Sequence, residues 1–415
     1  MRIVPRILFC VAYVAAVVVS QPARAQSSTA NSSQSLRDQV VAAAALLDRS
    51  SLTLRSQPAP EEDVPKPPIT DPEELDGQIQ RAGAPTLKIS GRIQFRYTAN
   101  VRNGMSGRNT ETGFTTPRLL LSVSRRISDV LSFYGETSAS RSTGQFSLST
   151  VFVTVRMSDN WSVRIGKFRP PFLREQFISS GRQLAVERSL VSSALGQGSG
   201  TGVRIRGATR RTRFYTAIVD RSRDLGSQRR RWAGTARLEY LLVGSFRRVR
   251  DFSPDSRGRS AILLGSAVAY QFEDRPAGRV ERTRLRWTGD VSLKRGRGSA
   301  FISITGAHIT RNDKGASLDQ FGLVAQGAYR MTKHWEAFAR GEFGIADEAG
   351  ADLALATIGV NAFFFGRNAI KFSADIGYAF TQIDNFWAVT RAGFLTDTPG
   401  LDGQLVLRTQ IQVTF

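Results

Sequence analysis

The chain has 415 residues, of which 41% are hydrophobic and 22% are charged, and its formal net charge is +22. Beyond the N-terminus no apolar run approaches the ~18 residues of a spanning helix, which excludes a bundle of membrane helices. A soluble protein of this charge would suggest a nucleic-acid partner, but the arginines are spread along the chain and form no single patch. A transmembrane β-barrel has the same composition as a soluble protein, because its strands alternate lipid-facing and lumen-facing residues.

The first 25 residues predict a signal peptide for export. Two arginines precede the apolar stretch 7–19, and residues 23–25 read Ala-Arg-Ala, the small-x-small form that signal peptidase cleaves. An uncleaved anchor is the alternative, but this stretch is short for a span. The only cysteine, Cys10, lies in the same segment. The mature chain is therefore expected to begin near Gln26 and to contain neither disulfides nor thiol chemistry.

Residues 26–86 predict a periplasmic tail and linker that is partly helical or disordered. The stretch 27–35 is small and polar, and 36–47 carries apolar residues at helical spacing. The stretch 58–72 is rich in proline and acidic residues, as linkers are. Simple disorder and a short oligomerising or wall-contacting helix both remain open for this region.

From residue 87 to residue 415 apolar and polar residues alternate with a period of two. Such runs are typical of strands with one face in lipid, and tilted spans need ~9–11 residues. The expected fold is all-β: a transmembrane antiparallel β-barrel of about 16 strands over 87–415, preceded by the periplasmic segment. The expected strands are 87–100, 115–126, 130–140, 147–157, 162–169, 201–209, 213–220, 232–241, 259–272, 281–294, 298–310, 319–330, 335–346, 351–365, 370–382 and 403–415.

The connections between these strands should alternate between short periplasmic turns and longer outer loops. Short turns are expected at 128–129, 158–160, 210–212, near 296, at 332–333 and at 366–368. Long loops are expected near 101–114, 170–200, 221–231 and 383–402. One turn on the periplasmic side, 244–258, is too long for the rule. A soluble propeller or solenoid would need a repeat of fixed length, which the sequence lacks.

If the apolar face of each strand meets lipid, the opposite face lines the lumen. Arginine stays charged at any relevant pH and offers a planar fork of donors to carboxylate or phosphate, so a surplus of inward arginines predicts an anion-attracting pore. For any single arginine, a salt bridge to a lumenal acid or a rim contact with lipopolysaccharide is the alternative. The inward cations are Lys88, Arg92, Arg96, Arg118, Arg126, Arg164, Arg204, Arg206, Arg213, Arg237, Arg282, Arg284, Arg286, Arg330, Arg340, Lys371 and Arg408. The inward acids are Glu136, Glu239, Asp290, Glu336, Glu342 and Asp375.

The segment 165–190 reads IGKFRPPFLREQFISSGRQLAVERSL and resembles the porin O/P family of phosphate- and polyphosphate-selective porins. The likeness is carried by a Gly-Lys-Phe strand end at 166–168, a Pro-Phe turn at 171–172 and Glu-Arg-Ser at 187–189, and is diffuse elsewhere in 87–415. It implies a sixteen-stranded trimer whose third loop folds into the barrel and narrows it. That loop is 170–200, and its candidate constriction residues are Arg174, Arg182, Glu187 and Arg188.

The resemblance also implies an anion path lined by arginines, with lysines that help to set phosphate selectivity. Apart from Lys167 at its approach, the third loop has no lysine, so anion preference is expected and phosphate or polyphosphate are candidate solutes. The Glu-Arg-Ser motif could instead be a structural anchor of the loop. A terminal aromatic such as Phe415 is read by the barrel-assembly machinery in outer-membrane proteins, which the resemblance extends to this chain.

The expected function is passive diffusion of small anions across the outer membrane. The expected partners are outer-membrane lipid, lipopolysaccharide and two further copies of the chain, with no nucleic acid and no cofactor. An enzyme would need a triad or a metal-ligand cluster, but His308 and His334 are the only histidines and fall on different strands. A plugged structural or adhesive barrel is the alternative function.

Overall fold

The computed structural model describes residues 87–139, 145–221, 230–255, 257–275, 280–311, 317–347, 349–350, 352–364 and 369–415. The signal peptide, the tail with its helix at 36–47 and the turn at 366–368 lie outside these residues. In the described ranges, no helix has the length and apolar character that crossing a membrane would require.

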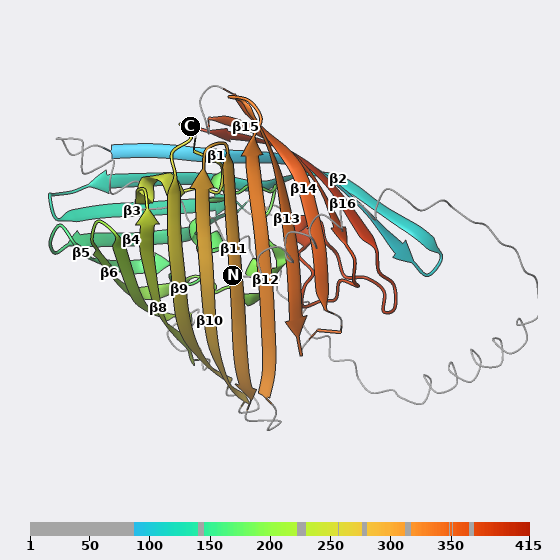
Figure 1. Ribbon diagram of the computed structural model, residues 1–415. Helices are drawn as coiled ribbons and strands as arrows, with labels where there is room; N and C mark the ends of the chain where they lie inside the picture. Colours follow the sequence, from blue (N-terminus) through green and yellow to red (C-terminus); the bar gives the residue numbers. More distant parts are fainter. Residues whose placement is uncertain are drawn as a thin grey trace, which may run out of the picture. The chain divides into compact units, whose positions relative to one another are not determined.

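Sixteen antiparallel strands close into one barrel, in which each strand pairs with its neighbours in sequence and β1 pairs with β16 (Figure 1). Closure gives every strand two partners and leaves no sheet edge. The predicted all-β barrel of sixteen strands is therefore confirmed. The strands are β1 (Leu87–Gly104), β2 (Gly107–Arg126), β3 (Leu131–Ala139), β4 (Phe146–Arg156), β5 (Trp161–Phe168), β6 (Gly200–Ala208), β7 (Thr212–Asp220), β8 (Arg230–Val243), β9 (Ala261–Arg275), β10 (Val280–Arg295), β11 (Gly298–Arg311), β12 (Ser317–Arg330), β13 (Trp335–Ala346), β14 (Leu353–Phe364), β15 (Ile370–Ala379) and β16 (Gln404–Thr414).

The two faces of each strand follow the predicted alternation. In β16, Leu405, Leu407 and Ile411 are exposed on the outside, whereas Arg408 and Gln412 on the inside are buried. The exposed outer side chains form an apolar surface that suits lipid. The residue identities thus determine which face of the barrel meets the membrane.

The expected long loop at 101–114 is wrong. β1 runs on to Gly104 and β2 begins at Gly107, so that a tight turn at Met105 and Ser106 joins a long hairpin. Residues 107–116 are exposed on both faces of this hairpin. A strand that has passed beyond lipid needs no apolar face, because backbone pairing alone holds it, and its sequence therefore shows no alternation.

Three connections fold inside the barrel and pack on its inner wall. The third loop, residues 169–199, contains α4 (Arg174–Phe177), η1 (Ser180–Arg182) and α5 (Leu190–Leu195), and Figure 1 shows its green helices enclosed by the strands. The inner turn, residues 244–260, contains η2 (Phe246–Val249). The last loop, residues 380–403, contains η3 (Thr390–Ala392).

Apolar side chains of these three segments pack against one another and against the barrel wall. Phe252 of the inner turn lies with Ile178 and Leu184 of the third loop against the inward Phe301 and Phe338. A second cluster joins the third loop to the last loop and to the wall. Its members include Leu190, Leu195, Ile383, Trp387, Phe394, Leu353, Leu355 and Val406. The in-folded segments therefore pack on the wall of β11–β16, and Phe172, Leu173 and Val249 also pack on the wall of β8 and β9.

Candidate anion passage

Buried ion pairs hold the third loop in place. The Glu187 carboxylate of the loop lies 3.2 Å from the Arg96 Nη2 atom and 2.5 Å from the Arg118 Nη2 atom, and its side chain is 1% exposed. Arg391 of the last loop approaches the same carboxylate at 3.5 Å. Burial by itself would raise the pKa of the Glu187 carboxyl, but Arg118, Arg391 and Arg96 together hold it well below its usual value. The carboxylate is therefore ionised and joins two strands to two loops.

Further wall residues anchor the loop along its length. Asp375 accepts a 2.8 Å hydrogen bond from the Val186 amide and an ion pair at 2.6 Å from Arg408. Glu342 accepts the Leu190 amide at 2.6 Å at the start of α5 and pairs with Arg340 at 2.9 Å. These contacts make the docked loop a fixed part of the lumen.

Several of the predicted pore-lining arginines consequently lie under the loop and away from open space. Arg96, Arg118, Arg340 and Arg408 face inward, and each is paired with a carboxylate of the third loop or of the wall. Arg237 is 1% exposed and is held by Asp290 at 2.8 Å and by Glu239 at 3.1 Å. Their inward direction agrees with the alternation, and the structure places them as anchors.

The predicted arginines of the third loop also have different surroundings. Arg188 donates to the carbonyl oxygens of Glu175 and Ile178 at 3.1 and 2.8 Å, so it braces the loop internally. Arg92 of the wall donates to the Ser179 hydroxyl at 2.7 Å, close to Arg182 in η1. Arg174 leaves the loop in another direction, toward the wall of β8 and β10.

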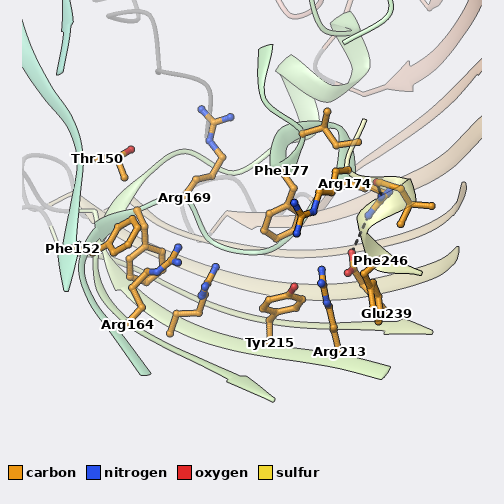
Figure 2. Close-up of a pocket in the computed structure, with 15 residues that line it drawn as sticks. Thr150, Phe152, Arg164, Arg169, Arg174, Phe177, Arg213, Tyr215, Glu239 and Phe246 are labelled. Carbon is orange, nitrogen blue, oxygen red and sulfur yellow. Dashed lines mark hydrogen bonds and ion pairs between the residues drawn. The ribbon is translucent and has the colours of Figure 1, made fainter. Parts of the chain in front are cut away.

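A cavity between the in-folded segments and the wall of β4–β8 is lined by six arginines and one glutamate. Three lining arginines come from the wall and three from the in-folded segments, and Figure 2 shows Arg164 and Arg213 of the wall on either side of Tyr215. The glutamate is Glu239, which Arg174 and Arg237 hold at 3.2 and 3.1 Å. The arginines are Arg164, Arg204 and Arg213 of the wall, Arg169 and Arg174 of the third loop, and Arg250 of the inner turn.

The wall arginines lie close to one another and against aromatic rings. Arg164 and Arg204 are direct cross-strand partners on β5 and β6, an arrangement that like charges disfavour. The Arg164 guanidinium lies 3.7 Å from the centre of the Phe152 ring. Arg213 lies 3.8 Å from the centre of the Phe246 ring. An anion entering here would offset the mutual repulsion of these cations.

Arginines continue on both sides of this cavity. Arg282, Arg284 and Arg286 alternate inward along the outer half of β10, where Arg286 and Arg221 donate to the same Gln271 oxygen at 3.1 and 3.2 Å. Toward the short turns, a second cavity is lined by Arg126, Arg156, Arg206 and Arg210, with Asp129 and Asp159. We call this series the arginine track.

The described lysines lie elsewhere. Lys88 is exposed at the start of β1, and Lys167 donates to the Leu148 carbonyl oxygen at 2.9 Å. Lys371 donates to the Gln183 carbonyl oxygen at 2.7 Å and so anchors the third loop. Among the described residues that line the central cavity, the cations are therefore all arginines.

The described ranges contain no group of three or more His, Cys, Asp or Glu residues that could hold a metal ion. His308 lies exposed beside Asp319 at 2.8 Å, and the ring of His334 contacts the Phe363 carbonyl oxygen at 3.0 Å. The two histidines belong to separate surroundings.

Ten of the fifteen residues that line the cavity were not predicted from the sequence, among them Arg169, Phe177, Phe246 and Arg250. Arg169 is the last residue of the predicted strand 162–169. Phe177 lies within the third loop, where only charged residues were candidates for the site. Phe246 and Arg250 belong to the inner turn, which was singled out only because it is too long for a periplasmic turn. That excess length was the one signal that could have located them.

A closed sixteen-stranded barrel with an apolar outer surface and an arginine-rich interior defines an outer-membrane porin. The family model for the phosphate-selective porins O and P matches residues 87–369, and the chain belongs to that family. Family and fold thus indicate a channel and not an enzyme. No curated protein sequence matches the chain.

Solved porin structures share this fold at low sequence identity. An anion-selective porin from Comamonas acidovorans is 12% identical with a TM-score of 0.56, over 80% of this chain and 100% of that one. OmpT of Vibrio cholerae in a trimer form is 11% identical with a TM-score of 0.53, over 79% and 99%. The outer-membrane channel DcaP of Acinetobacter baumannii is 11% identical with a TM-score of 0.51, over 80% and 98%.

Proposed function

We propose that this porin passes small anions by passive diffusion along the arginine track. The observation that carries the proposal is the central cavity, in which six arginines face one glutamate that is itself held by two arginines. Guanidinium groups at a constriction attract anions and repel cations, and low-dielectric walls strengthen that field.

The test is the reversal potential of the purified full-length channel in a planar bilayer under a KCl gradient. Chloride is expected to permeate better than potassium. The Arg204→Glu variant should weaken that preference, because it reverses a charge at the cavity. The matched control is Arg125→Glu, which makes the same charge change at an exposed position on the outer face of β2. A wild-type channel that prefers potassium contradicts the proposal.

One observation favours the second candidate, a plugged structural or adhesive barrel. The third loop, the inner turn and the last loop together fill one side of the lumen. If they close the passage, the purified protein inserts into bilayers and shows no discrete current steps. Discrete current steps would contradict the plugged barrel.

Phosphate or polyphosphate as the natural solute is a narrower form of the proposal, supported by the description of the family. A homotrimer is also proposed, since the resemblance implies one and OmpT of Vibrio cholerae occurs in a trimer form. The mass of the detergent-purified protein tests the trimer.

Cleavage of the signal peptide near Gln26 is tested by N-terminal sequencing of the exported chain.

We further propose that lipid and lipopolysaccharide cover the outer surface and that the assembly machinery reads Phe415. The Phe415 backbone bonds to Gly91 in both directions, at 2.8 and 3.0 Å, and its ring covers the Gly91 position. The aromatic residue thus lies at the β1–β16 seam, where the barrel closes. Loss of surface-assembled protein in a Phe415→Ala variant is the expected outcome.

A further inference from the structure

The short-turn end of the barrel carries a continuous series of arginines. Four neighbouring connections form this part of the rim, namely 127–130, 157–160, 209–211 and the inner turn. Backbone hydrogen bonds from amide to carbonyl oxygen join them to one another through the adjoining strand ends. These bonds run from Arg156 to Val130 at 2.7 Å, from Ala208 to Asn160 at 2.8 Å and from Leu241 to Arg211 at 2.7 Å.

The arginines at these connections outnumber the acids around them. The second cavity of the arginine track has four arginines and two aspartates, and a cavity beside the inner turn has the same numbers. Three of the four aspartates already hold a cation, since Asp129 pairs with Arg126, Asp251 with Lys294 and Asp255 with Arg259. Five arginines at this end have no ion pair with a described carboxylate, and we call them the turn rim: Arg156, Arg210, Arg211, Arg247 and Arg257.

The turn rim is open to solvent. Arg156 is half-buried and the other four arginines are exposed. Like charges gathered at one mouth of a barrel repel one another and attract anions. Guanidinium groups bind carboxylates through paired hydrogen bonds. The turn rim therefore favours a partner that carries several carboxylates close together.

The same chain contains such a segment directly before the barrel. Residues 71–76 read DPEELD, in which four of the six residues are acidic and none is basic. The chain as a whole has the opposite balance, with 57 lysines and arginines against 35 aspartates and glutamates. These six residues precede the described part of the chain, and their charge is opposite to that of the turn rim.

The acidic segment is tethered close enough to reach the turn rim. β1 begins at Leu87, which pairs with Arg125 near the end of β2, so the chain enters the barrel at the short-turn end. Asp76 lies eleven residues before Leu87, and a chain of that length spans up to about 36 Å. The turn 209–211 follows β6, five strands from β1, which is about 24 Å around the wall at ~4.8 Å per strand.

We propose that residues 71–76 bind the turn rim of their own chain through pairs of carboxylate and guanidinium groups. A tether that spans the two sites raises the local concentration of the segment to the millimolar order, so that individually weak, exposed ion pairs suffice. The bound carboxylates lower the positive potential at the short-turn mouth. An anion that has crossed the barrel is then held less strongly at this mouth.

The experiment measures disulfide formation in the exported full-length chain with Cys10→Ser and two introduced cysteines, Leu75→Cys and Asn160→Cys. Asn160 is exposed and lines the second cavity with Arg156 and Arg210, and neither new cysteine removes a charge. An intrachain cross-link is expected at low salt. Its rate should fall about fivefold at 1 M salt, where the Debye length is about 3 Å. The same fall is expected at low salt with Asp71→Asn, Glu73→Gln, Glu74→Gln and Asp76→Asn.

The matched control pairs Leu75→Cys with Lys333→Cys. Lys333 is exposed on the turn between β12 and β13, which lies at the same end, four strands from β1 in the other direction. This pair measures the reach of the tether without the turn rim, so its cross-link should form more slowly and should not respond to neutralisation of the segment. Equal rates for the two pairs, or a rate at Asn160 that neither salt nor neutralisation lowers, overturn the proposal. Cross-links that join two chains instead of one overturn the assignment to the same chain.

The arginine side is tested by the double variant Arg210→Gln and Arg247→Gln. Both residues are exposed, so the stability of the barrel should not change. Cross-linking at Asn160 should slow to the rate of the neutralised segment. The control is Arg295→Gln, at an exposed position at the end of β10, which should leave the rate unchanged. An unchanged rate in the double variant contradicts the pairing.

This inference and the proposed anion passage fail in different ways. The cross-link needs no ion flow, so a wild-type channel that prefers potassium removes the anion passage and leaves the cross-link result standing. A channel that prefers chloride but shows no salt-sensitive cross-link keeps the anion passage and removes only this inference.

Discussion

The inward arginines of this barrel serve two purposes, and the surroundings of each residue decide which. Arg96 and Arg118 lie beneath the third loop and share the Glu187 carboxylate, so their charges stabilise the docked loop. Arg164 and Arg204 have the same strand position and direction but lie beyond the loop, at the cavity. The Glu187 carboxylate folds onto the first two arginines, and sequence spacing does not reveal this contact.

The first prediction concerns Glu187. The Glu187→Gln variant leaves two buried guanidinium groups without their carboxylate, and breaking a buried pair in this way costs about 3–5 kcal/mol. The loop should undock part of the time, so single-channel conductance and current noise are expected to rise. A lower temperature for heat-induced unfolding in detergent should accompany the change.

The control for this prediction is Glu111→Gln. Glu111 pairs with Arg102 at 2.5 Å on the projecting hairpin, where its side chain is 56% exposed. Exposed pairs contribute at most about 1 kcal/mol, so conductance should not change. Unaltered conductance in both variants would show that Glu187 does not anchor the loop.

At the scale of elements, the inner turn acts as a support for the third loop. The Phe252 ring lies 4.6 Å from the Phe301 ring, and its carbonyl oxygen accepts the Ser299 hydroxyl at 2.6 Å. The Val249 carbonyl oxygen accepts a hydrogen bond from Arg174 of the third loop. The inner turn, which lies on the short-turn side of the barrel, thus positions one wall of the cavity.

The second prediction follows from this support. The Phe252→Ala variant removes a buried ring and should cost the local packing about 3–5 kcal/mol. Conductance should rise while the barrel itself persists, since no strand pairing depends on this residue. The measurement is single-channel current together with circular dichroism in detergent, and Phe146→Ala, on an exposed ring, is the control.

Deletion of the whole third loop would be a poorer test of the constriction. The loop covers inward apolar residues, among them Phe301, Phe338 and Leu355. Their exposure to a water-filled lumen would destabilise the barrel, so that a change in conductance could not be attributed to the constriction alone.

At the scale of the whole molecule, the barrel is asymmetric inside. The two largest apolar clusters of the in-folded segments lie against β11–β16, whereas the wall of the central cavity is formed by β4–β8. The six arginines of this cavity therefore lie on one side of the lumen.

The third prediction is a dependence of selectivity on salt. The Debye length falls from about 10 Å at 0.1 M to about 3 Å at 1 M ionic strength, so salt screens the more exposed arginines of the track. The preference of the wild-type channel for chloride should decrease between these concentrations. The measurement is the reversal potential at a fixed concentration ratio, and a preference that increases with salt would contradict the field-based mechanism.

The sequence by itself determined the strands and their faces. Period-two alternation predicted all sixteen strands, and the direction of residues such as Arg204 and Leu407 followed from it, because lipid on one side forces one face to be apolar. The same reasoning predicted that 170–200 is too long for a simple connector. It failed at 101–114, where the hairpin has left the membrane and lipid no longer selects an apolar face.

Only the tertiary structure decided which arginines line the central cavity and which hold the third loop. Arg118 and Arg164 look alike in sequence, and they differ because Glu187, nearly seventy positions from Arg118, folds onto one and not onto the other. The inner turn and the last loop enter the lumen through contacts that have no local periodicity. Long-range packing of this kind depends on where the closed barrel brings distant segments together. The period-two alternation along the chain does not indicate these positions.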